Sequence, residues 1–333
     1  MLTTSCTHAL ELASLLLDLK EEDEIIVPSF TFSSTVNSFM LRGAKPVFVD
    51  IRIDTKNIDE NKIEEKITKK TKAIFPVHYA GVSCDMDKIM DIAKRYNLPV
   101  VEDAAQGVKS KYKDKYLGTI GTFGCYSFHE TKNYICGEGG ALVINDKEFI
   151  ERAEIIREKG TDRSKFFRGQ VDKYTWVDIG SSYLPSEVLA ALLFAQLEDM
   201  DKIKRIRQNI YEKYLRAFMN LEEYKLVNLP VIPIECSTNY HMFHLLLKNE
   251  TERGDLIKHL ADKNINSVFH YIPLHSSPMG LKLGYKEGDF PITEDVSRRL
   301  VRLPFYNSMT EEEQDYVIGE VINCLKGKVA LQR

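Results

Sequence analysis

Several features that would place the chain in a membrane-bound, secreted or nucleic-acid-binding class are lacking. The 333 residues contain no apolar run that approaches the length of a membrane span. The apolar stretch at residues 10–19 includes Glu11 and Asp18 and has no basic segment before it, so it indicates a buried helix and not a signal peptide. A net charge of −4 at pH 7 gives no reason to expect a nucleic acid or a membrane surface as a partner.

Paired cysteines are lacking as well. The chain has six cysteines and no Cys-x-x-Cys pair. They lie at Cys6, Cys84, Cys125, Cys136, Cys236 and Cys324. We therefore expect no disulfide framework and no metal site, and we expect the protein in a reducing cytoplasm.

What the first half does contain is an alternation of strand and helix patterns. Short apolar segments between helix-breaking residues predict strands that are buried on both faces. They lie at residues 24–27, 46–50, 72–77 and 98–102. Between the last two, Asp85 is suited to cap a helix over residues 86–96, and Asn97 is suited to end it. Strands that alternate with helices predict an α/β fold with a large, mostly parallel sheet.

The second half predicts a long helix followed by a smaller α/β unit. The helical pattern covers residues 186–215, which is long for a globular helix and could join two domains. After it come strand patterns at residues 243–247 and 267–271, a polar helix at residues 252–263 and two terminal helices. We predict a large domain over residues 1–200 and a small C-terminal domain over residues 201–333.

Ligands of parallel sheets bind beyond the carboxyl ends of the strands, and Asp50, His78 and Asp103 are expected there. A lysine follows nearby in the stretch Ser127-Phe128-His129-Glu130-Thr131-Lys132-Asn133. An amine that can form a Schiff base and an acid that can hold a pyridinium proton are what pyridoxal phosphate (PLP) requires of a protein. Taken alone, Lys132 is also compatible with a solvated surface lysine, and Asp103 with a structural carboxylate.

A phosphate site adds weight to this pair. The hydroxyl-rich turn at residues 3–7 leads into the apolar helix, where free backbone N–H groups and the helix dipole favour an anion. Ser127 could add a hydroxyl to the same phosphate. Plain N-capping of the helix by Ser5 or Thr7 remains the alternative.

Five motifs, in order, carry a family resemblance. They are Ser5-Cys6-Thr7, Pro28-Ser29-Phe30-Thr31-Phe32, Glu102-Asp103-Ala104-Ala105-Gln106, Ser127-Phe128-His129 with Lys132-Asn133, and Gly137-Glu138-Gly139-Gly140. Along essentially its whole length the chain resembles the DegT/DnrJ/EryC1/StrS sugar aminotransferases. These are fold-type-I PLP enzymes that act on nucleotide-linked keto sugars, with a large mixed, mostly parallel sheet domain and a smaller C-terminal α/β domain.

The resemblance implies a role for each matching residue around the cofactor ring. Lys132 forms the Schiff base with the cofactor and moves the proton during catalysis. Asp103 pairs with the pyridine nitrogen, and Gln106 contacts the ring hydroxyl. Phe32 stacks on the ring face, although core packing remains an alternative for it.

The resemblance also implies a phosphate site shared with a second subunit. Thr7, the backbone N–H of His8 and Ser127 hold the phosphate. Most members of the family carry an asparagine that reaches the phosphate of the partner subunit, and Ser182 stands at that position here. The implied assembly is therefore a homodimer with shared active sites.

Three further segments resemble one branch of the family in particular. They are residues 76–81, 166–176 and 270–275. The branch converts dTDP-4-dehydro-6-deoxy-D-glucose into dTDP-4-amino-4,6-dideoxy-D-galactose, with L-glutamate as the amino donor and 2-oxoglutarate as its product. An aminotransferase for another keto sugar, either 3-keto or GDP-linked, remains open. His78, His270 and His275 are candidates for contact with the sugar substrate, and a structural role is the alternative for each.

One departure concerns the start of the chain. Members of the family carry a longer segment before the phosphate turn, whereas Met1 stands just before Ser5 here. We expect exposed apolar surface where that segment would pack. An inactive or regulatory remnant therefore remains a third possibility.

Overall fold

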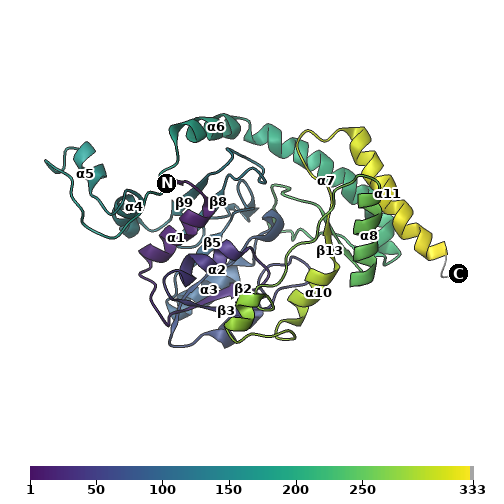
Figure 1. Ribbon diagram of the computed structural model, residues 1–333, viewed down its shortest axis with the longest axis horizontal. Coiled ribbons are helices and arrows are strands. Elements are labelled where there is room, and N and C mark those ends of the chain that lie inside the picture. The colour runs from purple at the N-terminus through teal and green to yellow at the C-terminus, as the bar shows by residue number, and fades with distance from the viewer. Residues whose placement is uncertain (331–333) are drawn as a thin grey trace.

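A mixed, mostly parallel sheet forms the centre of the first half of the protein (Figure 1). The computed structural model describes residues 1–330. The strands of this sheet are β1 (Leu2–Thr3), β2 (Glu24–Pro28), β3 (Lys45–Val49), β4 (Thr71–Ile74), β5 (Val101–Asp103), β8 (Phe123–Ser127) and β9 (Gly140–Ile144). Strand β2 pairs in parallel with β3 and β4, and β5 pairs in parallel with β8. Strands β9 and β1 are added antiparallel at one edge.

Two single parallel bridges join these strands into one surface, Ile74 to Val100 and Val77 to Asp103. The order across the surface is therefore β3-β2-β4-β5-β8-β9-β1. This arrangement confirms the expected fold class and the four strands predicted in the first half. Strand β5 stands in the middle of the order, so the residues at its carboxyl end lie at the centre of the sheet edge.

Three helices cover this sheet, α1 (Cys6–Leu16), α2 (Ser33–Met40) and α3 (Met86–Tyr96). Helix α3 has the predicted ends. Asp85 accepts a hydrogen bond from the Lys88 N–H, and Asn97 takes the left-handed conformation at φ 52°. Helix α1 buries Ala9, Leu12 and neighbouring apolar residues against α2 and the sheet, so the predicted buried helix is confirmed.

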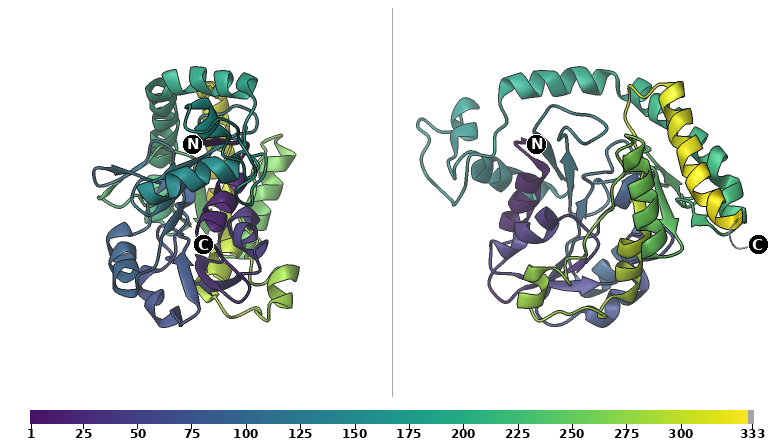
Figure 2. Two further views of the ribbon diagram at one scale, coloured as in Figure 1. Left: turned by 90° about the vertical axis from the view of Figure 1, so that its left-hand side faces the viewer. Right: turned by 45° about the vertical axis from the view of Figure 1, so that its right-hand side comes forward.

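The C-terminal part has its own antiparallel sheet and core (Figure 2). Its strands are β10 (Val227–Asn228), β12 (His244–Leu247) and β13 (Leu300–Arg302). Helices α7 (Met200–Glu223), α8 (Glu250–Asp262) and α11 (Glu311–Ala330) pack together beside it. Large buried residues at the centre of this core include Tyr214, Phe218 and Phe243. The exact boundary at residue 200 stays a prediction.

Two predicted elements differ from the structure. The helix expected over residues 186–215 is two helices, α6 (Glu187–Glu198) and α7, because Asp199 leaves helical geometry between them. The strand expected at residues 267–271 is wrong, since only Val268 bridges to Arg302. The chain leaves the sheet after Val268, where the side chains of His270 and Tyr271 make hydrogen bonds to residues in the first half of the chain.

The remaining elements are short or peripheral. They are β6 (Lys111–Tyr112), β7 (Lys115–Tyr116) and β11 (Cys236–Ser237), the helices α4 (Ile150–Arg157), α5 (Arg163–Phe167), α9 (Pro278–Lys282) and α10 (Pro291–Arg299), and the 3₁₀ turns η1 (Glu60–Lys62), η2 (Glu64–Lys66), η3 (Tyr79–Gly81) and η4 (Lys147–Phe149). The segment that carries α5 stands away from the sheet (Figures 1 and 2). Within residues 1–330, no helix is both long and apolar enough for a membrane crossing.

Asp50 ties the main sheet to α10. It follows β3 and is 4% exposed. Its Oδ1 accepts hydrogen bonds from the N–H and the hydroxyl of Thr293, both at 2.8 Å, and its Oδ2 accepts one from the Ile292 N–H at 3.2 Å. The predicted place of Asp50 at a strand end is confirmed, and its carboxylate contacts α10, the Ile51 N–H and Lys62.

We predict that Asp50→Ala lowers the free energy of unfolding by about 2 kcal/mol, because buried N–H donors at the start of α10 lose their acceptor. Asp50→Asn is the matched control, since its amide oxygen can still accept, and should cost less than half as much. Urea unfolding monitored by circular dichroism measures both variants. Equal losses in the two variants would contradict the capping role.

Candidate functional site

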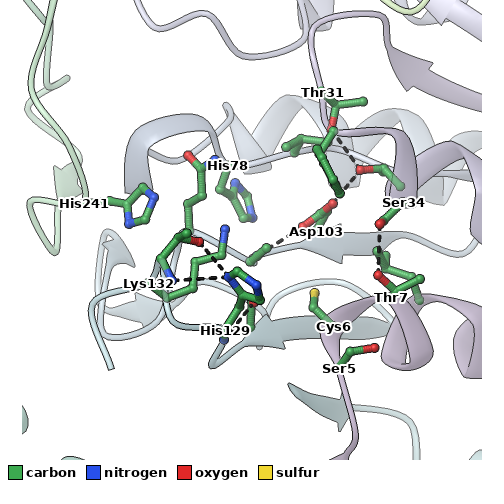
Figure 3. Close-up of a pocket in the computed structure, with 18 of the residues that line it drawn as sticks. Ser5, Cys6, Thr7, Thr31, Ser34, His78, Asp103, His129, Lys132 and His241 are labelled. Carbon is green, nitrogen blue, oxygen red and sulfur yellow. Dashed lines mark hydrogen bonds between the residues drawn. The ribbon is translucent and has the colours of Figure 1, made fainter. Parts of the chain in front are cut away.

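A cavity of about 490 Å³ lies beyond the carboxyl ends of the parallel strands (Figure 3). One wall is made by the starts of α1 and α2. The floor comes from the ends of β5 and β8, and the opposite wall comes from residues 241–242 and 270–271 with Arg302. The cavity therefore lies between the two parts of the fold, as expected for a ligand site of an α/β sheet.

Lys132 enters this cavity from the loop after β8. No hydrogen bond to its Nζ is recorded within residues 1–330. Burial lowers the pKa of Lys132 below its ordinary value, and the positive charge of Arg302 acts in the same direction, whereas Cys6 and Asp103 act against it. A lowered pKa increases the neutral fraction of the amine, which is the form that attacks a carbonyl carbon.

Asp103 ends β5 and presents its carboxylate to the same cavity. Its Oδ2 accepts a hydrogen bond of 2.7 Å from the Thr35 hydroxyl, which is itself 2.8 Å from the Thr31 hydroxyl. Its Oδ1 accepts one of 3.1 Å from the Ala105 N–H. These neutral donors fix the carboxylate and leave its charge unpaired, which suits an acceptor for a protonated ring nitrogen.

Gln106 is held in place at both ends of its amide. Its oxygen accepts from the Ala80 N–H at 2.6 Å, and its nitrogen donates to the Tyr271 hydroxyl at 3.1 Å. Gln106 lines the cavity with Tyr271, so the position that the family resemblance implied is available to it. Contact with the cofactor's ring hydroxyl stays a prediction.

The start of α1 forms the predicted phosphate wall. Thr7 and Ser127 line the cavity, and the Thr7 hydroxyl donates to Ser34 Oγ at 2.9 Å. The first N–H groups of a helix have no partner inside the helix, so this end can hold an anion. The N–H of His8 is different, because it donates to Ser5 Oγ at 3.1 Å. For His8 the capping alternative describes this structure. Its predicted phosphate contact would require the His8 N–H to exchange the Ser5 hydroxyl for a phosphate oxygen.

Gly140 sets how close the glycine turn approaches this wall. A Cβ at residue 140 would overlap the backbone of Ser5 and Cys6. Only glycine therefore lets β9 pass beside the phosphate turn. Gly137 contributes differently, since it has a positive φ of 85° and open space around it.

Two more predicted cofactor residues can be placed. Phe32 lines the cavity and is 60% exposed, so one ring face is free to stack and simple core packing does not describe it. Ser182 is exposed and lies outside the lining of this cavity. That position is compatible with a contact to a second subunit. Both roles stay predictions.

The three predicted substrate histidines differ from one another. His78 lines the cavity but is fully buried, donates to Glu102 at 2.9 Å and accepts from the Cys84 N–H at 3.2 Å. His275 is also fully buried, between Ser29 and Glu294, and it does not line the cavity. Because both ring nitrogens of each are occupied, the geometry argues for the structural alternative.

His270 also lines the cavity, and its Nδ1 shares a hydrogen bond of 3.0 Å with the Tyr79 hydroxyl. Burial, with smaller contributions from Arg302 and Lys132, lowers its pKa to about 2. The ring is therefore neutral at physiological pH, and its other nitrogen can bond a substrate hydroxyl. Contact with the sugar stays a prediction for His270.

Several lining residues were missed by the sequence reasoning. They are Ser34, Thr35, His241, Tyr271 and Arg302. The polar run at the start of α2 was a usable signal for Ser34 and Thr35. Arg302 sits in a short apolar segment where only terminal helices were expected, so nothing local marks it as a site residue.

The donor set fits PLP. A buried amine of lowered pKa, a fixed carboxylate and a hydroxyl-lined helix start lie around one cavity. No group of three or more potential metal ligands occurs in the described part of the chain. Fold and site together define a fold-type-I PLP-dependent transferase.

Comparison with known proteins identifies the family. The model of the DegT/DnrJ/EryC1/StrS aminotransferase family matches residues 1–322, and the chain belongs to this family. It is 37% identical to the GDP-perosamine synthase of Escherichia coli O157:H7 over 95% of this chain and 82% of that protein. It is 35% identical to the spore coat polysaccharide biosynthesis protein SpsC of Bacillus subtilis over 97% of this chain and 84% of that protein.

A solved structure supports the cofactor assignment. The chain is similar to Spr1654 of Streptococcus pneumoniae in its PLP form, with a TM-score of 0.89 and 26% identity over 98% of this chain and 87% of that one. The protein is therefore a sugar aminotransferase whose cofactor is pyridoxal 5′-phosphate.

We predict that Gly140→Ala weakens PLP binding by about 10-fold or more, because the methyl group pushes β9 away from the phosphate turn and misplaces its donors. Gly254→Ala in α8 is the control, since its methyl group would meet nothing within 4 Å. Titration of the cofactor-free proteins with PLP, followed by the visible absorbance, measures both. Unchanged affinity in Gly140→Ala would show that the close approach does not matter.

Proposed function

We propose that the protein transfers an amino group from L-glutamate to C4 of a nucleotide-linked 4-keto-6-deoxy sugar. The specific substrate we propose is dTDP-4-dehydro-6-deoxy-D-glucose, and the product is dTDP-4-amino-4,6-dideoxy-D-galactose. The observation that carries the reaction type is the placement of Lys132 and Asp103 in one cavity, with the hydroxyl-lined start of α1 beside them.

The residues of this chain would divide the work as follows. Bound PLP supplies an aldehyde that condenses with amines and a ring that takes up electron density from the adjacent carbon. Asp103 holds a proton on the ring nitrogen. Thr7, Ser34 and Ser127 orient the phosphate. Lys132 Nζ, whose pKa is lowered by burial, would accept the proton from the donor's α-carbon and later give a proton to C4 of the sugar.

The choice of substrate has weaker support than the reaction type. It rests on the resemblance of residues 76–81, 166–176 and 270–275 to one branch of the family. Two of these segments meet at the cavity wall, where Tyr79 bonds His270. The segment at residues 166–176 carries Arg168, which pairs with Glu154 through two hydrogen bonds of 2.9 and 3.0 Å. Only the segments at residues 76–81 and 270–275 therefore support the substrate from within one subunit.

A GDP-linked sugar is the second candidate. It is favoured by the 37% identity to a protein named GDP-perosamine synthase. The two candidates share the reaction at the sugar ring and differ in the nucleotide. A direct comparison of dTDP- and GDP-linked 4-keto-6-deoxy sugars therefore decides between them.

We predict that the purified protein with PLP shows a visible absorbance band that L-glutamate converts to a near-ultraviolet band. Adding the dTDP-linked keto sugar should restore the visible band, because the amino group passes to the sugar. Lys132→Ala should lose turnover by at least about 10⁴-fold, since the same amine binds the cofactor and moves the proton. Absorbance and mass spectrometry of the sugar nucleotide measure these steps.

Lys69→Ala, which changes an exposed lysine, is the control and should behave as the unaltered protein. Restoration by the GDP-linked sugar alone would select the second candidate. A folded protein that binds no PLP would leave the inactive remnant as the correct interpretation of this chain.

We propose in addition that two copies of the chain form a dimer through α6 and the segment before it. Helix α6 is apolar over most of its length, yet only Leu193 of its residues is buried. Val188 is 78% exposed and Trp176 is 76% exposed. A patch of this kind is typical of a protein interface. Ser182 lies in the same region, as its predicted contact with the partner's cofactor phosphate requires.

We predict that the double variant Val188→Glu, Phe194→Glu is monomeric and binds PLP more weakly, because charge in a dry interface opposes association and the site loses its second subunit. Ile234→Glu changes a hydrophobic residue that is 95% exposed and outside α6, and should remain dimeric. Sedimentation velocity measures the state of each. A double variant that sediments as the unaltered protein does would disprove the interface.

A further inference from the structure

Arg302 is a guanidinium in the cavity wall that has no anionic partner among the described residues 1–330. It ends β13 and lines the cavity opposite the start of α1. Within residues 1–330 the structure records no hydrogen bond or ion pair for its side chain, and its Nε is buried without an acceptor. A buried donor without an acceptor is costly, so such a group calls for a functional explanation.

Arg207 shows how the same fold treats a structural guanidinium. It is 5% exposed and donates to the backbone oxygens of Tyr240 and His241 at 3.0 and 2.6 Å and to Asn307 at 2.8 Å. It also lies over the ring of Phe305. The N–H donors of Arg207 are thus satisfied by the protein itself, whereas those of Arg302 are available to a ligand.

No carboxylate of residues 1–330 pairs with Arg302 in the cavity. His241 and His270 are neutral, because burial lowers the pKa of both and the charge of Arg302 adds to the effect. Of the two carboxylates that line the cavity, Asp103 is held by Thr35, and the Glu138 side chain is mostly exposed beside His129.

Arg302 belongs to the reacting end of the cavity. Its charge is among the causes that lower the pKa of Lys132, and it shares its wall with His241. Figure 3 shows Lys132 between His241 on one side and the turn of Ser5, Cys6 and Thr7 on the other. The cavity therefore has one anion site at the start of α1. A second group that can bind an anion, the guanidinium of Arg302, lies on the opposite side, at the end where Lys132 stands.

We propose that Arg302 binds the α-carboxylate of the amino donor. This assignment rests on the proposed transamination. The α-carboxylate is one bond from the carbon that loses its proton, so its binding group must stand beside Lys132. In a nucleotide-linked 4-keto sugar the nearest phosphate is attached at C1, across the ring from the reacting C4. A guanidinium on the inner wall, able to bind a carboxylate through two parallel hydrogen bonds, fits the first geometry.

The test uses the PLP-loaded protein and the Arg302→Gln and Arg302→Lys variants. Conversion of the visible band by increasing L-glutamate gives the dissociation constant of the donor. It should rise about 100-fold in Arg302→Gln, which loses the charge, and about 10-fold in Arg302→Lys, which keeps the charge but not the paired donors. Arg205→Gln, on the exposed face of α7, is the control and should leave the constant unchanged.

Two further ligands separate the carboxylate from other anions. 4-Aminobutanoate has the amine and the distal carboxylate but no α-carboxylate, so its affinity should be the same in Arg302→Gln and the unaltered protein. Binding of dTDP, measured by calorimetry, should also be unchanged. A merely structural defect would weaken all three ligands together, which overturns the proposal.

The other outcomes are equally clear. Loss of dTDP affinity with normal glutamate affinity would assign Arg302 to the nucleotide diphosphate and overturn the proposal. Normal glutamate affinity in Arg302→Gln overturns it while leaving the transamination intact. If the unaltered protein binds PLP but does not react with glutamate, the proposed function fails first, and the Arg302 proposal falls with it.

Discussion

The site depends on how strand β5 ends. Glu102 is fully buried and accepts hydrogen bonds from three backbone N–H groups of residues 118–121 and from His78. Burial opposes its charge, but the bonds from His78 and those N–H groups outweigh it and lower the pKa of Glu102. This carboxylate locks β5 to the loops on both sides. Because side chains alternate along a strand, the next residue, Asp103, points the opposite way, into the cavity.

Much of the first half could be predicted from sequence because its signals are local. The strand patterns, the cap at Asp85 and the end at Asn97 depend on residues close together in the chain, and the structure confirms them. The failure at residues 267–271 depends on distant contacts. The chain at residues 267–271 leaves the sheet where His270 and Tyr271 bond Tyr79 and Gln106, which are 191 and 165 residues away in the sequence. No pattern within residues 267–271 contains that information.

The candidate site shows the same division. Lys132 and Asp103 were predictable because a lysine before a glycine turn and an acid at a strand end are typical of PLP proteins. Position alone could not tell His78 from His270, because what separates them is whether both ring nitrogens already have partners. Arg302 was invisible for the opposite reason. Its importance lies in the partners that it lacks, which only three-dimensional neighbours can reveal.

The neutral histidines around the cavity have a consequence for the polarity of its wall. Burial is the main reason that His241 and His270, with His244 behind them, have pKa values far below the physiological range. A moderate fall in pH would therefore leave these three histidines uncharged, so they would add no positive charge beside Arg302. The polarity of this wall would therefore rest on hydrogen bonding by uncharged imidazoles and not on their protonation.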